Sequence, residues 1–288
     1  MSFNIVKTTT QPITYIIHGI GSSQKQLTEI NTSLKDNGVL IYNLGLSGDP
    51  ITSIFTSMDK QCSLYNDEII STLKFLKKSN TTFPLINFIG ISQGGLIVRC
   101  LVERYNDLLY SVKNVITISS PHMGVYYKNG TEHKWFHNME EVTFSEYWKD
   151  PFTYDIYLKS KKFLARLNNE VAHTEYNKFK YNFMNINKLI LIWSNIDTVI
   201  QPQQSPIFNY WDINKAKQEK KLVPVFVNNT KWYSNDNLGL RYLNEVDSIV
   251  QYMYQCNHDE FKLPICFNNL SITVNNDTLL DTLVKYTI

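Results

Sequence analysis

The sequence lacks any apolar stretch of the about 18 residues that a membrane-spanning helix needs, and it does not open with a basic segment followed by an apolar core. We therefore expect no transmembrane segment and no signal peptide. It also lacks an excess of one charge, since 28 basic and 26 acidic residues leave a net charge of +2. That balance gives no electrostatic indication of binding to nucleic acid or to an anionic membrane.

Cysteine is scarce, and no two cysteines form a CxxC pair. The four are Cys62, Cys100, Cys256 and Cys266. Their spacing predicts buried thiols, and it gives no support for a disulfide framework or a zinc site. Together with the missing signal peptide, this favours a reducing, intracellular compartment.

The 288 residues are 43% hydrophobic, which is enough for one large domain or two small ones. Six short apolar runs predict buried strands, at residues 13–19, 39–46, 84–90, 112–121, 187–195 and 247–255. Amphipathic patterns between and after them predict helices at residues 23–38, 59–78, 93–105 and 276–286. Strands that alternate with helices in this way indicate βαβ units and a mostly parallel sheet flanked by helices.

This alternation lapses over residues 125–185, which are rich in aromatic and polar side chains and contain several short helical patterns. We predict a helical insertion there, over the carboxyl end of the sheet. The α/β core would then comprise residues 1–124 and 186–288.

The joint between one strand and its helix reads Gly90-Ile91-Ser92-Gln93-Gly94-Gly95. Gly-x-Ser-x-Gly at this position is typical of a nucleophile elbow, in which flanking glycines permit a close backbone approach and the turn displays the serine. The alternative is a serine helix cap that happens to lie between glycines. The strand before Ser92 and the amphipathic helix after it favour the elbow.

A nucleophilic serine needs a base, and the base needs an orienting carboxylate; on hydrolase sheets they follow in the order Ser, Asp or Glu, His. Of six histidines only His258 lies beyond the resumed sheet, in a loop just after its last strand. Asp197 follows an apolar strand between the two, although an Asx turn would also explain it. The competing carboxylates lie in less suitable contexts: Asp212, Glu219, Asp236, Glu245, Asp247 and, adjoining the base, Asp259.

Acyl transfer also requires donors for a developing oxyanion. The glycine-rich HGIGSS segment after the first strand predicts the main-chain N–H groups of Ile20 and Gln93 as those donors. His18 and His122 are interpreted as structural. His133 and His137 have no HExxH motif or carboxylate cluster beside them. We therefore predict neither a metal nor an organic cofactor.

These residues resemble the palmitoyl-protein thioesterase family of α/β-hydrolases over about residues 13–262. HGIG resembles the oxyanion loop, GISQGG with Arg99 the elbow and its helix, and EYWKDP (146–151) a motif of the insertion. NIDTVIQP resembles the acid loop that carries Asp197. YSNDNLGLRYL (233–243) resembles a segment whose distance from the family histidine places that histidine at His258.

The resemblance implies an α/β-hydrolase that cleaves thioester-linked long-chain fatty acyl groups through an acyl-enzyme. Its partners would be S-palmitoylated proteins or peptides, or long-chain acyl-CoA. The insertion would form the walls of an acyl groove. Two features depart from the family: Ser22 stands where Asp is common, and Cys62 and Cys100 do not match the family's disulfide cysteines. The family is typically lysosomal, whereas the sequence favours an intracellular location.

Two other functions stay open. One is an oxygen-ester lipase or esterase on the same fold. The other is an acyl-lipid binding protein that keeps the fold without catalysis, against which the set of Ser92, Asp197 and His258 argues.

Overall fold

The structure is a computed structural model that describes residues 11–46, 50–77, 85–106, 111–127 and 142–288. Its centre is a six-stranded sheet in the order β2-β1-β3-β4-β5-β8, and every neighbouring pair is parallel. The strands are β1 (Ile13–Ile17), β2 (Ile41–Leu44), β3 (Ile86–Ile91), β4 (Val112–Ile118), β5 (Lys188–Trp193) and β8 (Ile249–Met253). The predicted parallel sheet is confirmed.

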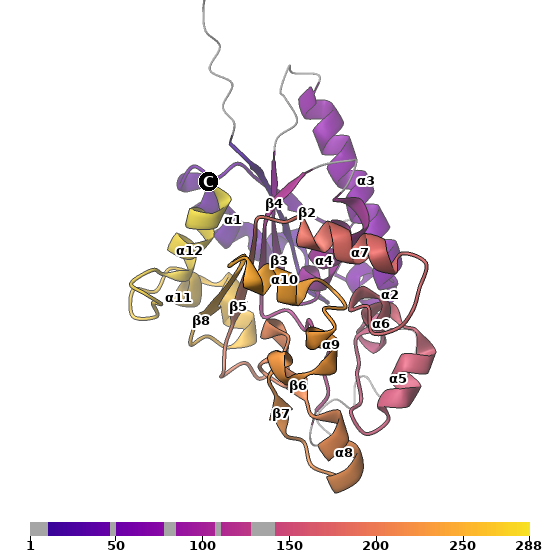
Figure 1. Cartoon of the computed structure of the whole chain (residues 1–288). Coiled ribbons are helices and arrows are strands. Elements are labelled where there is room, and N and C mark those ends of the chain that lie inside the picture. Colours follow the sequence, from indigo (N-terminus) through magenta and orange to yellow (C-terminus); the bar gives the residue numbers. More distant parts are fainter. Residues whose placement is uncertain (1–10, 47–49, 78–84, 107–110, 128–141) are drawn as a thin grey trace, which may run out of the picture.

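Helices cover both faces of this sheet (Figure 1). One side carries α1 (Thr28–Asp36), α11 (Pro264–Phe267) and α12 (Leu279–Thr287); the other carries α3 (Met58–Lys77), α4 (Gln93–Tyr105) and α7 (Tyr176–Met184). Successive strand residues point to opposite faces, so Phe88 joins the core under α3 and α4 while Ile89 joins the core under α1 and α12. Continuous apolar runs are therefore what a sheet buried on both faces requires.

The predicted helices are present with shifted ends. The first starts as the 3₁₀ turn η1 (Gln24–Leu27) before α1. The last begins three residues later than predicted, at Leu279. Thr278 and Asp281 cap it reciprocally, because the Thr278 hydroxyl accepts from the Asp281 amide while the Asp281 carboxylate accepts from the Thr278 amide.

Segments that follow β4 and β5 leave the sheet at the carboxyl ends of these strands. The described part of the predicted insertion is helical, with η2 (Thr143–Glu146), α5 (Tyr154–Ser160), α6 (Phe163–Leu167) and α7. The sequence did not predict the elements between β5 and β8: η3 (Ser205–Ile207), β6 (Tyr210–Trp211), α8 (Ile213–Glu219), β7 (Pro224–Val225), η4 (Val227–Asn229), α9 (Lys231–Ser234) and α10 (Leu240–Glu245). Figure 1 shows α5, β6, β7 and α8 together at one end of the molecule.

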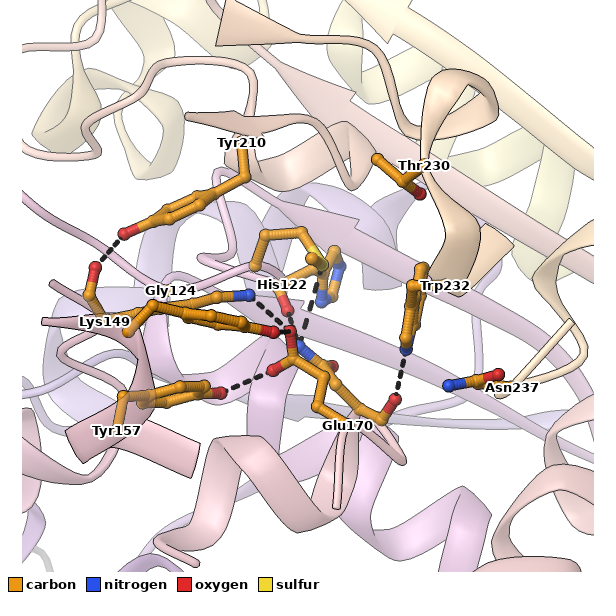
Figure 2. A network of polar contacts seen from close by, with 12 residues as sticks. His122, Gly124, Lys149, Tyr157, Glu170, Tyr210, Thr230, Trp232 and Asn237 are labelled. Atoms are coloured by element: carbon orange, nitrogen blue, oxygen red, sulfur yellow. Dashed lines mark hydrogen bonds and ion pairs between the residues drawn. The ribbon is translucent and has the colours of Figure 1, made fainter. Parts of the chain in front are cut away.

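A buried polar network joins the segment after β4 to the segment after β5 (Figure 2). Lys149 Nζ lies 2.6 Å from Glu170 Oε1, and both side chains are almost fully buried. The Tyr157 hydroxyl donates to Glu170 at 2.6 Å, and the Tyr210 hydroxyl, from β6, donates to the carbonyl of Lys149. A buried charge is tolerated only when it is paired and hydrogen-bonded. Tyr210 connects this buried pair to β6, because its hydroxyl bonds to Lys149 and its ring lies beneath Lys149 Nζ.

A second buried pair fixes the insertion to α4. Arg99 bonds to Glu103 at 2.9 Å with both side chains fully buried, and it also donates to Asn168 Oδ1 at 2.9 Å and to the carbonyl of Leu167 at 3.2 Å. Burial raises the pKa of Glu103, although Arg99 opposes that rise. The buried Glu103 carboxylate therefore depends on Arg99 to stay charged.

The prediction of free buried thiols is wrong. Cys62 of α3 is bonded to Cys100 of α4, and Cys256 is bonded to Cys266 of α11. The Cα atoms of the pairs are 6.2 and 5.9 Å apart, within disulfide range. The first pair could not be predicted from spacing, because its two cysteines are 38 residues apart in sequence and come together only through helix packing. The cysteines therefore no longer support the prediction of a reducing compartment.

We predict that Arg99→Met lowers the free energy of unfolding by about 3–5 kcal/mol, because Glu103 would stay buried without its partner. Urea unfolding measures this. Arg241→Met is the matched control, since Arg241 forms an exposed pair with Glu245 and should change stability by less than about 1 kcal/mol. The double variant Arg99→Met/Glu103→Met should recover part of the loss. Equal effects of Arg99→Met and Arg241→Met would contradict the prediction.

We also predict that protein folded under oxidising conditions and then denatured without reductant has no cysteine that a thiol reagent can label. After reduction, the reagent should label all four cysteines. Peptide mapping should recover the Cys62–Cys100 and Cys256–Cys266 crosslinks. Four reactive thiols before reduction, or exchanged partners, would refute the pairing.

Candidate active site

Ser92 occupies the joint between β3 and α4 in a sharp backbone turn. Its φ of 55° and ψ of −125° are unusual for a residue other than glycine. Its amide donates to the carbonyl of Ile118 at the end of β4, at 2.8 Å. The turn is therefore held at the carboxyl edge of the sheet, as a nucleophile elbow requires.

The flanking glycines allow backbone segments to approach closely. A Cβ on Gly90 would lie 2.5 Å from the Cα of Gly95, and one on Gly94 would overlap the carbonyl of Ile17 at the end of β1. Gly19, in the loop after β1, lies close to Ser92, since a Cβ there would make a tight contact of 3.0 Å with the Cβ of Ser92. The loop that contains Ile20 is thereby packed directly against the elbow.

Asp197 follows β5 in a tight turn, and its side chain is buried. Its Oδ1 accepts from the amides of Val199 at 2.8 Å and Ile200 at 2.9 Å, and its Oδ2 accepts from His258 Nδ1 at 2.8 Å. The Asx turn and the histidine contact, which were alternatives for Asp197 in the sequence, occur together. The turn orients the carboxylate that holds the imidazole.

The pKa of Asp197 reflects two opposed effects. Burial raises it, but hydrogen bonding and charge interaction with His258, together with the amides of Ile200 and Val199, outweigh burial and place the pKa below its usual value. The carboxylate is therefore ionised at neutral pH. An ionised acceptor at Nδ1 leaves Nε2 as the nitrogen that can take up a proton from a neighbour.

The loop of His258 is braced by residues that the sequence did not single out. Asn257 Oδ1 accepts from the amide of His258 at 2.8 Å and from the hydroxyl of Thr198 at 2.9 Å. Glu260 accepts in turn from the amide of Asn257 at 2.6 Å. An Asn-x-x-Glu capping pattern at 257–260 was the available signal. The Cys256–Cys266 disulfide encloses the same loop.

Ser92 and His258 line one cavity of about 180 Å³. Ile20 and Val199 line it as well, and Lys262 and Asp259, which pair at 2.9 Å, form part of its wall. Asp197 lies behind His258, at hydrogen-bonding distance. The structure thus brings Ser92, His258 and Asp197 to one end of the sheet, together with the loop of Ile20.

Gln93 is the first residue of α4. The first amides of a helix have no acceptor within the helix, so its N–H can serve a ligand beside Ser92. Its side chain is buried and points into the protein, where it bonds to residues of α2 (Thr52–Phe55) and α3.

Two further histidines, His18 and His122, make contacts with residues other than Asp197. His18 is buried, with Nδ1 2.8 Å from the carbonyl of Gly19 and Nε2 3.4 Å from the hydroxyl of Tyr65. His122 is buried against Thr117 Oγ1 at 2.9 Å and stacks on Phe208. The candidates His133 and His137 lie outside the described residues.

Within the described ranges, no three His, Cys, Asp or Glu side chains are placed to hold a metal ion. The helices described there include none with the length and apolar character to cross a membrane.

We predict that Asp197 contributes to the pH dependence of stability. Its pKa is lower in the folded protein than the ordinary value of 3.8, so its contribution is complete above that value and is lost as the pH falls through the folded pKa. Between pH 5 and pH 3, Asp197→Asn should therefore lose less unfolding free energy than the wild type. Urea titrations at both pH values measure the difference, and identical losses would count against it.

The chain is similar to known proteins in sequence and in fold. The sequence model of the family described as palmitoyl protein thioesterase matches residues 13–258. Palmitoyl-protein thioesterase 3 of Dictyostelium discoideum is 29% identical over 264 residues, covering 86% of this chain and 85% of that protein. The lysosomal thioesterase PPT2 homolog of Drosophila melanogaster is 27% identical over 82% of this chain and 81% of that protein. Human lysosomal thioesterase PPT2 is 32% identical over 58% of this chain, and that match spans 57% of the human protein.

Among solved structures, carboxyl esterase 2 of the mycorrhizal fungus Tuber melanosporum superposes with a TM-score of 0.55 at 13% identity, covering 96% of this chain and 79% of that one. At that identity the likeness concerns the fold, which is the α/β-hydrolase fold. The match over residues 13–258 extends from β1 to the histidine that Asp197 holds. This chain therefore belongs to the palmitoyl protein thioesterase family and has the α/β-hydrolase fold.

Proposed function

We propose that this protein is a serine thioesterase that removes long-chain fatty acyl groups, palmitoyl in particular, from cysteines of S-acylated proteins or peptides or from coenzyme A. Membership of the family and the fold support a hydrolase. The observation that carries the finer proposal is the 2.8 Å bond between Asp197 and His258, with His258 and Ser92 lining the same cavity. Ser92, Asp197 and His258 form the proposed triad.

In the proposed mechanism, Ser92 Oγ attacks the thioester carbonyl while His258 Nε2 takes its proton. The amides of Ile20 and Gln93 stabilise the resulting oxyanion. Collapse of the tetrahedral intermediate breaks the C–S bond, and His258 returns the proton to the leaving thiolate. Water then attacks the acyl-Ser92 ester with His258 as base, and release of the fatty acid restores the serine. Asp197 orients His258 and stabilises its charged form.

The proposed acyl groove is walled by the insertion, residues 125–185, against the core of residues 1–124 and 186–288. Three contacts support this division of roles. The hydroxyl of Tyr127 donates to the carbonyl of Val199 at 2.5 Å, which connects the insertion to the acid loop. The rings of Tyr126, Trp148 and Phe144 pack beside one another after β4. Aromatic side chains close to the acid loop would suit an aliphatic chain if they face the groove.

The preference for thioesters is drawn from the names of the relatives, which are thioesterases of palmitoyl-proteins or of the lysosome. A matched pair of substrates, palmitoyl-CoA and an oxygen ester of palmitate, tests it. We expect the higher kcat/KM on the thioester. A strong preference for the oxygen ester would support the lipase or esterase alternative instead.

We predict that Ser92→Ala and His258→Ala lower kcat on palmitoyl-CoA by at least about 10⁴-fold, because each removes a member of a unit that acts together. Asp197→Asn should lose about 10⁴-fold through the wrong imidazole tautomer. Asp212→Asn, at the N-terminal cap of α8, is the control for the same chemical change and should keep activity within about twofold.

A fluorophosphonate probe completes this test, since it labels an activated serine. The wild type and Asp212→Asn should be labelled, and Ser92→Ala should not. An unlabelled wild type would end the enzyme proposal in favour of an acyl-lipid binding protein, and equal labelling of Ser92→Ala would end the role of Ser92.

A further inference from the structure

A cluster of buried polar side chains contacts the elbow through the side chain of Gln93. We call it the Ser53 cluster. It consists of Ser53, Gln61, Gln93, Thr143 and Tyr147, each at most 3% exposed. They come from α2, α3, α4 and the η2 segment of the insertion. Since buried polar groups need partners, their contacts constrain the backbone around them.

Ser53 contacts both segments that carry the proposed oxyanion donors. Its Oγ accepts from the amide of Gly21 at 2.9 Å, one residue beyond Ile20. Its carbonyl accepts from Gln93 Nε2 at 3.1 Å. The hydroxyl proton of Ser53 is directed to the carbonyl of Pro50 at 2.7 Å, which fixes the Oγ lone pairs toward Gly21.

The rest of the cluster holds the side chain of Gln93 in place. Gln93 Nε2 also donates to Gln61 Oε1 at 3.3 Å, and Gln93 Oε1 accepts from the hydroxyl of Tyr147 at 3.2 Å. Gln61 Nε2 donates to the carbonyl of Ser53 at 3.1 Å. Both polar ends of the Gln93 amide are thus engaged, and one of the partners belongs to the insertion.

We propose that Ser53 is a positioning residue that sets the separation of the two halves of the oxyanion hole. The proposal rests on the proposed function. The two donor amides lie on separate segments, the loop after β1 and the first turn of α4, and must converge on one oxygen at about 2.7–3.1 Å. The loop has the freedom of Gly19 and Gly21, the latter at a φ of +63°. The Ser53 hydroxyl is the side chain that restrains the Gly21 amide, and in a buried setting such a bond holds its geometry tightly.

The proposal predicts a specific kinetic signature. Ser53→Ala leaves the Gly21 amide without its acceptor, so the loop can move away from the developing oxyanion while the acyl-binding surface stays unchanged. We expect kcat on palmitoyl-CoA to fall by about 10–100-fold, less than the loss of a donor itself, with KM within about twofold. The pH profile should not move, because Asp197 and His258 are untouched.

The decisive readout is inhibition by a palmitoyl trifluoromethyl ketone, whose serine adduct carries an oxyanion, compared with inhibition by palmitate. For Ser53→Ala the Ki of the ketone should rise in parallel with the loss of kcat/KM, whereas the Ki of palmitate should stay constant. Ser71→Ala is the matched control, since the Ser71 hydroxyl bonds within its own helix to the exposed carbonyl of Asp67. It should leave kcat, KM and the Ki values of the ketone and of palmitate unchanged.

Two further variants test the proposal if Ser53→Ala folds poorly. Ser53→Cys keeps the size but offers a weak acceptor and should lower kcat; Ser53→Thr keeps the hydroxyl and should restore kcat to within about fivefold of wild type. An unchanged kcat in Ser53→Ala and Ser53→Cys, a loss confined to KM, or a ketone Ki that does not follow kcat/KM would overturn the proposal. A wild type that neither hydrolyses palmitoyl-CoA nor binds the ketone would instead overturn the proposed function, and this inference with it.

Discussion

The close backbone contact between the carboxyl end of β1 and the first turn of α4 is the constraint on which the rest of the site depends. It exists because position 94 is glycine, so that the helix can lie against the carbonyl of Ile17. Parallel pairing of β1 with β3 places these two chain segments side by side. The same approach puts Gly19 against Ser92 and leaves the loop of Ile20 beside the elbow.

The parallel order of the sheet extends this arrangement to the acid and the base. β4, β5 and β8 follow β3 in space, so the loops after β5 and β8 also open at the carboxyl edge. Asp197 and His258 come from those two adjacent loops and meet at 2.8 Å. Two bonds connect the described part of the predicted insertion to the segments around it. Arg99 of α4 donates to Asn168 Oδ1. The Tyr210 hydroxyl of β6 donates to the carbonyl of Lys149. Arg99 and Lys149 are themselves paired with buried carboxylates, and removing one partner of either pair would leave a buried charge uncompensated.

Sequence periodicity and the order of elements along the chain predicted the parallel sheet and the candidate site residues. The six strands were recognisable because a sheet buried on both faces leaves continuous apolar runs. The sequence singled out Asp197 and His258 as candidates because strand ends meet at one edge and because histidine is rare. Asp197 bonds to His258, and His258 lines one cavity with Ser92; their catalytic roles stay proposals.

The features that the sequence did not reveal depend on contacts between distant parts of the chain. Cys62 and Cys100 pair across two packed helices. β6 and β7 have two residues each, too few to show an alternating pattern. Ser53 is separated by 32 residues from Gly21 and by 40 from Gln93, and nothing in its local sequence marks it as a residue that touches both.

The central claim is that catalysis passes through an acyl ester of Ser92. The most direct measurement is rapid mixing of wild-type protein with palmitoyl-CoA, acid quenching within the first turnover, and mass-spectrometric mapping of the peptides. The account predicts a palmitoyl group esterified to Ser92 that appears together with a burst of free coenzyme A. Turnover without any acylated peptide, or with the acyl group on another residue, would contradict it.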